Sequence, residues 1–216
     1  MESEPRSNSE VEENLRLFRK ARTGDWGAFQ ELVGGFQGRV FAVTMRITGQ
    51  RQDAEDATQQ TFLSVIEHME QFREESTVAT WILRIATNHA LKILRKRRGL
   101  PTVSLESPAE ADNDYATLPH PDYIAEWQDN PADLAQRAEV REILDQKLSE
   151  LDDKYRVVFV LRDIEGFSVR ESAEMLGLTE ANVKVRLLRA RLVLREKLTQ
   201  TFGDEATRVF PDHSHE

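Results

Sequence analysis

Residues 77–98, TVATWILRIATNHALKILRKRR, decide the fold class of the N-terminal half of this chain. At 100° per residue the hydrophobic side chains fall on one stripe, as in an amphipathic helix. This stripe consists of Val78, Trp81, Ile82, Ile85, Ala86 and Ile93. A second face, expected to point outward, carries Thr80, Arg84, Thr87, Asn88, Leu91 and Arg95. The stretch has no acidic residue and ends in a basic run, which suits either contacts with nucleic-acid phosphates and bases or an ordinary solvated helix end.

The composition narrows the compartment and the class of partner. The chain has 216 residues, no cysteine and a net charge of −9. The lack of cysteine excludes disulfides and thiolate metal sites and predicts a protein of the reducing cytoplasm. No apolar run is long enough to span a bilayer, and the start, MESEPRSNSE, has no apolar signal-peptide core, so we expect no membrane insertion. The negative charge excludes a nucleic-acid binder that is basic all over, so any DNA contact must come from local basic patches.

Three further helices are predicted before residue 77, and no strand pattern is found there. The first helix spans about 10–22. Asp25 is the expected N-cap of the second helix, which ends at Gly49. Three glycines inside this second helix predict a kink or close packing: Gly34, Gly35 and Gly38. The first hundred residues therefore predict a helical bundle.

The third helix, at about 52–69, has two distinct sides. Its apolar side consists of Phe62, Val65, Ile66 and Met69. Its first two turns are crowded with acidic and amide side chains: Asp53, Glu55, Asp56, Gln59 and Gln60. Acidic residues near a helix N-terminus are favourable to the helix dipole, which is the structural explanation. The functional explanation is an acidic docking face for a basic partner.

Residues 99–135 predict a flexible linker. The stretch is rich in Pro, Asp, Glu and Ala and has too few apolar residues to offset the entropy lost on ordering. Between Gly99 and Asp153, acidic residues outnumber basic ones by more than the net charge of the whole chain. Three aromatic residues in the linker could anchor it on a partner or on the folded parts of the chain: Tyr115, Tyr123 and Trp127.

Helical pattern resumes at about residues 134–151 and continues to about residue 200. Asp152 or Asp153 is the expected cap of a buried helix over 155–162. Ser168 and Glu171 form a capping-box pattern that opens a short helix to Leu176. Gly177 then makes a turn, and Thr179 caps a long helix. A helix, a short turn with glycine and a second helix predict a helix-turn-helix unit.

The helix after Thr179 has one face for the core and one for a ligand. The inward side consists of Val183, Leu187, Ala190, Leu194 and Leu198. The opposite side combines hydrophobic Val185 and Leu188 with Arg189. Arg189 could pair bidentately with a guanine, and Val185 could contact a thymine methyl group. Exposed hydrophobic side chains are hard to explain on a purely solvated face, which favours DNA over an ordinary three-helix unit.

Two motifs in this order resemble a known family. Asp53-Ala54-Glu55-Asp56 with Gln59 and Phe62, followed by TWILRIATN at 80–88 and a basic end, is similar to region 2 of the extracytoplasmic-function (ECF) sigma factors. LDDKYRVVFVLRDIEGFSVRESAEMLGLTEANVKVRLLRAR, from Leu151, is similar to their region 4. The resemblance implies an all-α protein of two helical domains, at 10–98 and 136–200, joined by the acidic flexible linker 99–135 and followed by a polar tail, 201–216.

The resemblance also implies three groups of site residues. Those matching the helix that docks on core RNA polymerase are Asp53, Asp56, Gln59, Gln60 and Phe62. Those matching the part that opens and reads the −10 promoter element are Phe72, Arg73, Ser76, Thr77, Trp81, Arg84, Asn88, Arg95, Lys96 and Arg97. Those matching the −35 reader are Asn182, Lys184, Val185, Arg186, Leu188, Arg189 and Arg191. The implied partners are bacterial core RNA polymerase, promoter DNA and an anti-sigma factor.

This sequence departs from the family pattern at two places. The family often has Ser at the position of Val185, which bears on the exact −35 sequence. It lacks the pair Gly34-Gly35, which bears on the rigidity of the second helix.

Other function classes fit less of the chain. A sigma-mimicking protein that sequesters an anti-sigma factor would not need both basic helices, and an ordinary helix-turn-helix regulator leaves the Trp81 helix and the acidic helix unexplained. No enzyme is predicted, because the clustered carboxylates have no nucleophile, phosphate loop or metal-spaced partners. The scattered histidines are His68, His89 and His120, of which His89 falls on the apolar stripe as a hydrogen-bonded core residue. Neither a metal site nor a cofactor is expected, because the metal-binding side chains of the tail lack fixed geometry: Asp212, His213, His215 and Glu216.

Overall fold

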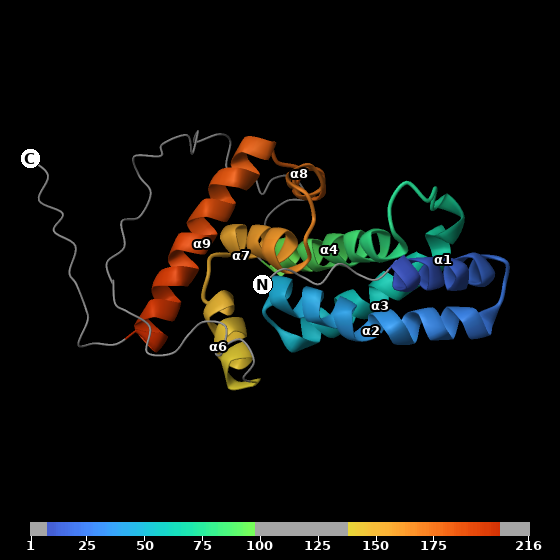
Figure 1. The fold of residues 1–216 in the computed structure, drawn as a ribbon, viewed down its shortest axis with the longest axis horizontal. Coiled ribbons are helices and arrows are strands. Elements are labelled where there is room, and N and C mark those ends of the chain that lie inside the picture. The colour runs from blue at the N-terminus through green and yellow to red at the C-terminus, as the bar shows by residue number, and fades with distance from the viewer. Residues whose placement is uncertain (1–7, 98–137, 204–216) are drawn as a thin grey trace, which may run out of the picture.

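The computed structural model describes residues 8–97 and 138–203, and every regular element within them is helical (Figure 1). The first group is α1 (Asn8–Arg22), α2 (Trp26–Thr48), α3 (Arg51–His68), the 3₁₀ turn η1 (Met69–Gln71) and α4 (Val78–Arg97). The second group is α6 (Ala138–Ser149), α7 (Asp153–Phe159), the π-helical turn η3 (Val160–Ile164), α8 (Val169–Leu176) and α9 (Glu180–Phe202). The predicted all-α fold class is confirmed. The predicted linker, 99–135, and the predicted tail after Gly203 lie outside the described residues, with their aromatic and histidine residues. Residues 201–202, predicted as the start of the tail, instead belong to α9.

The ends of the helices form where the capping residues predict. Asp25 accepts a hydrogen bond from the amide of Ala28 at 3.0 Å, and Gly49 closes α2 with φ 69°. Ser168 and Glu171 form both hydrogen bonds of the capping box, at 3.1 and 2.8 Å. Asp152, rather than Asp153, caps α7. These side chains satisfy backbone groups that the helix itself leaves without partners.

Close packing at the three glycines of α2 is a wrong prediction. All three lie on the exposed side of the helix, and a Cβ atom built on any of them would meet no atom within 4 Å: Gly34, Gly35 and Gly38. Helix α2 is continuous through this stretch.

Helix α4 is buried on more sides than its hydrophobic stripe predicts. It packs against α1, α2 and α3, and α8 of the second group lies against it as well (Figure 1). Thr87 and Leu91, expected to point outward, are therefore buried. Arg84 and Arg95 are partly exposed and Asn88 is exposed.

The buried face of α3 also differs from the prediction. It consists of Ala54, Ala57, Thr61 and Val65, and the small residues among them allow α2 to approach closely. Thr44 of α2 hydrogen-bonds across this contact to the Ala54 carbonyl at 3.2 Å and to the Thr58 hydroxyl at 3.1 Å. Ile66 consequently lies outside the core, with 44% of its surface exposed, and its assignment to the apolar core side was wrong.

The two groups of helices pack against each other. Helix α2 contacts α6, α7 and η3, and one set of buried hydrophobic side chains runs through both groups. Arg156 of α7 is only 4% exposed, and its guanidinium donates to the Ile47 carbonyl at the end of α2 at 3.1 Å. Arg39 of α2 binds the Glu165 carboxylate at 2.7 Å. This packing places α8 beside α4.

Candidate nucleic-acid interface

Helix α9 presents the predicted −35 residues on its outer side. The core side of the helix, Val183, Leu187, Ala190, Leu194 and Leu198, is buried as predicted. On the other side Lys184, Leu188 and Arg191 are exposed. The remaining members of the predicted set are partly exposed: Asn182, Val185, Arg186 and Arg189. The structure therefore brings all seven together within residues 182–191 of one helix.

The two best-placed arginines of α9 are held differently. The Arg191 guanidinium makes two hydrogen bonds to the Asp163 carboxylate, at 2.7 and 2.6 Å, and this bonding raises the pKa of Arg191. Arg189 donates to the neutral Tyr155 hydroxyl at 3.3 Å. A charge-assisted bidentate pair is stronger than one long bond to a neutral group. Arg191 must therefore give up this charge-assisted pair with Asp163 before its guanidinium can contact a base edge.

The predicted −10 loop, residues 72–77, is anchored by its ends. The Phe72 ring is buried and packs against Phe18 and Trp81, with ring centroids 4.9 and 5.3 Å apart. At the other end the Thr77 hydroxyl accepts a hydrogen bond from the Thr80 amide at 3.1 Å. Phe72 thus belongs to the core in this structure.

The middle of the loop and the aromatic residue of α4 remain accessible. Arg73 and Ser76 are exposed, and Trp81 is half-buried. The groups that are accessible here are of the kinds that bind a nucleic-acid base: a cation, a hydroxyl, an indole and an amide. They belong to Arg73, Ser76, Trp81 and Asn88.

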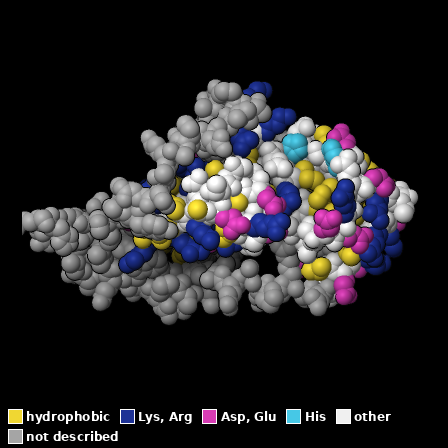
Figure 2. Space-filling model, turned by 90° about the horizontal axis from the view of Figure 1, so that it is seen from above, with side chains coloured by type: hydrophobic (Ala, Val, Ile, Leu, Met, Phe, Trp, Pro, Cys, Tyr) yellow, Lys and Arg dark blue, Asp and Glu magenta, His cyan; other side chains and the backbone are white. Residues whose placement is uncertain are grey.

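A hollow of about 330 Å³ opens beside Trp81 and Asn88. A larger hollow, of about 490 Å³, lies away from these residues, between α2 and α6. The walls of the smaller hollow are Ser64, His68, Gln71, Trp81, Ile85, Asn88 and His89. Figure 2 shows histidine side chains close together on one face of the molecule, with hydrophobic ones beside them. An indole wall with imidazole and amide edges suits a planar ring that carries hydrogen-bonding groups.

One serine connects the two histidines of this hollow. The Ser64 hydroxyl hydrogen-bonds His89 Nε2 at 2.9 Å, and the Ser64 carbonyl accepts from His68 Nδ1 at 2.9 Å. Burial, and then the nearby Lys92, lower the pKa of His89, so its neutral form is favoured. Sequence reasoning predicted a hydrogen-bonded His89 but did not connect it with Trp81 and Asn88. The sequence signal for this cluster was the i, i+4 spacing of Ser64 and His68, which places two residues on the same face of a helix.

Two of the predicted −10 cations have acidic partners in this structure. Arg97 binds the Asp53 carboxylate at 2.9 Å, and Arg84 lies 3.6 Å from Glu174 of α8. Lys96 is exposed and Arg95 is half-buried. The Arg84–Glu174 pair joins α4 to the helix-turn-helix unit across the contact between the two groups.

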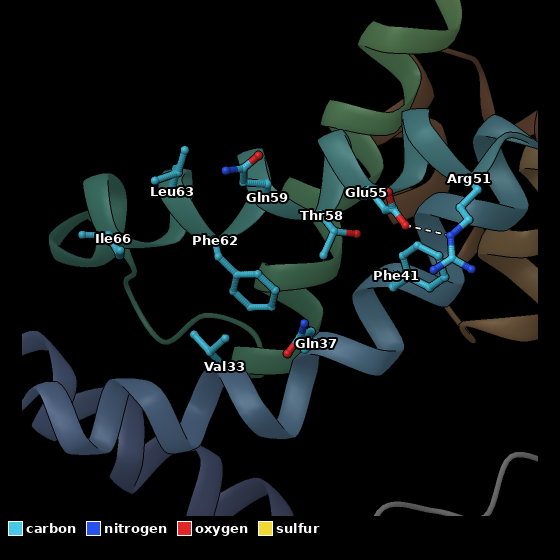
Figure 3. Close-up of a pocket in the computed structure, with 10 residues that line it drawn as sticks. All are labelled: Val33, Gln37, Phe41, Arg51, Glu55, Thr58, Gln59, Phe62, Leu63 and Ile66. Atoms are coloured by element: carbon cyan, nitrogen blue, oxygen red, sulfur yellow. Dashed lines mark hydrogen bonds and ion pairs between the residues drawn. The ribbon is translucent and has the colours of Figure 1, made fainter.

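The predicted polymerase-docking residues lie along α3. Asp56, Gln59 and Gln60 are exposed, whereas Asp53 is half-buried beside Arg97 and Phe62 is half-buried against α2. Phe62 and Gln59 line a groove of about 590 Å³ between α2 and α3 (Figure 3). Its full lining is Val33, Gln37, Phe41, Arg51, Glu55, Thr58, Gln59, Phe62, Leu63 and Ile66.

Two hydrophobic residues of this groove were not predicted as site residues. Leu63 is 47% exposed and Ile66 is 44% exposed, which is unusual for large aliphatic side chains so close together. Figure 3 shows Phe62 and Val33 facing each other across the groove and Leu63 directed outward. In the sequence, the signal that Leu63 and Ile66 are exposed was their position away from the stripe that Ala54, Ala57 and Val65 form. The groove is thus an apolar surface with a polar rim, including the Arg51–Glu55 ion pair at 2.8 Å.

Within residues 8–97 and 138–203, no helix has the length and apolar character needed to cross a bilayer. In the same residues no three His, Asp or Glu side chains are grouped so that they could hold a metal ion.

Comparison with known proteins matches both halves of the chain. Residues 32–99 match the family Sigma-70 region 2, and residues 141–194 match Sigma-70, region 4. The ECF RNA polymerase sigma factor SigE of Mycolicibacterium smegmatis is 33% identical over 187 residues, covering 85% of this chain and 68% of that protein. The ECF RNA polymerase sigma factor SigW of Bacillus subtilis is 29% identical over 183 residues, covering 85% of this chain and 95% of that protein.

A solved structure has a similar fold. CnrH, in complex with the cytosolic domain of CnrY, is 25% identical with a TM-score of 0.54, covering 87% of this chain and 98% of that chain. The likeness covers both helical groups. With two sigma regions in order and a relative at 33% identity, this chain belongs to the ECF RNA polymerase sigma factors.

Proposed function

We propose that this sigma factor docks on core RNA polymerase through α3 and the adjoining groove, opens the −10 element with the 72–77 loop and α4, and reads the −35 element with α9. The observation that carries the proposal is the outer side of α9, where Leu188 and Val185 lie among Arg and Lys side chains. A recognition helix reads base edges with its first turns and holds phosphates with neighbouring cations. The protein acts in the cytoplasm and has no catalytic step of its own.

The groove between α2 and α3 fits a protein partner. Exposed Leu63 and Ile66 supply an apolar centre, and Asp56, Gln59 and Gln60 supply a polar rim, as in protein interfaces generally. We assign this surface to core polymerase. An anti-sigma factor is the second expected partner, since a protein of the same fold, the sigma factor RpoE of Bartonella quintana, has been solved in complex with the anti-sigma factor NepR.

Run-off transcription tests the whole proposal. Purified full-length protein is added to bacterial core polymerase on a library of genomic fragments from the source organism, and the transcripts are mapped. We expect initiation at a set of promoters that share a −10 and a −35 element. A sigma mimic would bind an anti-sigma factor yet give no transcript, and an ordinary regulator would bind DNA without core polymerase.

Replacing Arg189 with alanine should weaken initiation selectively. A bidentate arginine–guanine contact discriminates against a wrong base by about 1–3 kcal/mol, so we expect about tenfold or greater loss at promoters with an intact −35 element. Arg195→Ala, on the same helix outside the predicted reader, is the matched control and should change little. The measurement is initiation rate on promoters altered at single −35 positions. An equal loss on every altered promoter would assign Arg189 to phosphate rather than to a base.

Replacing Asp56 with arginine should slow the assembly of holoenzyme. A rim charge acts chiefly on the association rate through long-range attraction, so the loss should shrink as ionic strength rises. Stopped-flow association with labelled core polymerase measures both effects. Glu67→Arg, an exposed acidic residue farther along α3, is the control. An unchanged association rate would remove Asp56 from the docking surface.

A further inference from the structure

The loop before α4 contains a backbone conformation that no other non-glycine residue of the described ranges shares. Glu74 has φ 59°, whereas the other positive values in these ranges belong to glycines. The left-handed region is unfavourable for a residue with a Cβ atom, and such residues persist where surrounding contacts hold them. Glu74 lies between Arg73 and Ser76, both exposed members of the proposed −10 loop.

Helix α1 supplies the contact that holds Glu74. The Arg19 guanidinium donates from Nε to Glu74 Oε1 at 3.0 Å and from Nη2 to Oε2 at 2.5 Å. This two-pronged geometry fixes the direction of the carboxylate as well as its distance. The hydrogen bonds from Arg19 lower the pKa of Glu74, so the carboxylate stays ionised at neutral pH.

Phe18, the residue before Arg19, also packs against this loop. The Phe18 ring is buried and packs edge-on against Phe72, at 4.9 Å, and against Trp81, at 5.5 Å. Helix α1 therefore contacts the loop at Phe72 and Glu74 and the indole at the start of α4. Yet α1 lies outside residues 32–99, which match Sigma-70 region 2.

We infer that Arg19 and Glu74 are positioning residues for promoter recognition, through which α1 sets the conformation of the −10 loop. The ion pair keeps Glu74 in the left-handed conformation, and that conformation directs the neighbouring Arg73 and Ser76. Neither Arg19 nor Glu74 needs to touch DNA. This inference rests on the proposed role of the 72–77 loop.

The same helix offers a matched control. Arg16 is also 56% exposed and also pairs with a glutamate, Glu13 at 2.5 Å, but this partner is on α1 itself. Arg16→Ala removes the same charge and the same type of contact from α1 without touching the loop. A difference between the Arg19 and Arg16 variants therefore reports the loop contact.

The test uses holoenzyme assembled from full-length protein and a promoter that it transcribes. The probes are a single-stranded non-template oligonucleotide carrying the −10 element and the same oligonucleotide with that element scrambled. We expect Arg19→Ala and Glu74→Gln to bind the −10 oligonucleotide about two- to fivefold more weakly, as an exposed ion pair allows. Binding to the scrambled oligonucleotide, and binding by Arg16→Ala, should match the wild type. The charge-swapped double variant Arg19→Glu/Glu74→Arg should regain part of the loss.

A second arm separates positioning from charge. Glycine adopts a φ of 59° without strain. The loop of the Glu74→Gly variant should therefore no longer depend on the contact with Arg19. Arg19→Ala should then have no further effect in the Glu74→Gly background. Additive losses in this double-mutant cycle would overturn the inference.

The outcomes also distinguish the inference from the function on which it rests. A wild-type holoenzyme without preference for the −10 oligonucleotide would overturn the role of the loop, and the inference with it. Preference in the wild type, with Arg19→Ala indistinguishable from Arg16→Ala, would overturn the inference alone. Equal losses on both oligonucleotides would show that Arg19 supplies charge to DNA instead of positioning the loop.

Discussion

Replacing Leu63 with glutamate is expected to weaken the binding of this sigma factor to core RNA polymerase by about 30-fold or more. The few central side chains that dominate a protein interface each contribute about 2 kcal/mol or more, and about 1.4 kcal/mol is a factor of ten. Leu63 is 47% exposed beside Ile66 and directed outward from the groove. When polymerase covers the groove, the charged carboxylate of glutamate at this position would lose its hydrating water, which opposes binding.

The change should leave the fold intact. The core face of α3 is Ala54, Ala57, Thr61 and Val65, and glutamate is a good helix former on the outer face. The thermal unfolding midpoint of Leu63→Glu should therefore stay close to that of the wild type.

Trp26→Glu is the matched control for this experiment. Trp26 is also a large, exposed hydrophobic residue of the described ranges, but it starts α2 and does not line the groove. Equilibrium binding to fluorescently labelled core polymerase measures both variants. If Leu63→Glu bound as tightly as Trp26→Glu, the groove would not be the polymerase surface. Run-off transcription by the wild type would still stand, so the docking site alone would need to be reassigned.

The helix ends could be predicted from the sequence because capping is local chemistry. Asp25, Ser168 and Thr179 each accept a hydrogen bond from the amide three residues ahead, and no distant residue is needed for that contact. The hydrophobic periodicity of α9 was equally reliable, since one face packs inward and the other meets solvent.

The buried surface of α4 and α3 could not be predicted in the same way. Periodicity shows that a helix has an apolar face, but the number of neighbours depends on tertiary packing. Thr87 and Leu91 are buried because α4 is surrounded by several helices. Ile66 is exposed because small residues bring α2 to a different side of α3.

The candidate site residues also fall into two classes, those with a local signal in the sequence and those without one. Residues matched by motif, such as Asn88 and Arg189, lie on α4 and α9, and their roles at the promoter stay predictions. Residues that act through a partner distant in sequence, such as Arg19 and Glu74, have no local signal. The interaction of Arg156 with the Ile47 carbonyl joins residues 109 apart, and no pattern in either segment indicates it.

Replacing Arg156 with methionine is expected to destabilise the protein by about 3–5 kcal/mol, the usual cost of removing one partner from a buried ion pair. The buried Asp153 carboxylate would lose its pairing with Arg156, which lies 2.5 Å away. Three backbone carbonyls would also lose the donor that Arg156 provides: Ile47, Ser149 and Leu151. Buried acceptors that lose their hydrogen bonds add to the cost because no water replaces the donor. The free energy of unfolding in urea measures the effect.

Two further variants decide why Arg156 matters. Arg170→Ala removes an arginine from the exposed pair with Glu174 and should change the stability by no more than about 0.5 kcal/mol. The double variant Arg156→Met/Asp153→Leu should be more stable than Arg156→Met alone, because no buried charge is left without a partner. If Arg156→Met were as stable as Arg170→Ala, the guanidinium would be solvated in solution, and the contact between α7 and the end of α2 would be open. A large loss that the second substitution partly restores would instead show that the buried Asp153 carboxylate causes part of the loss. The part that is not restored would then come from the carbonyls that lose their donor, including that of Ile47 at the end of α2.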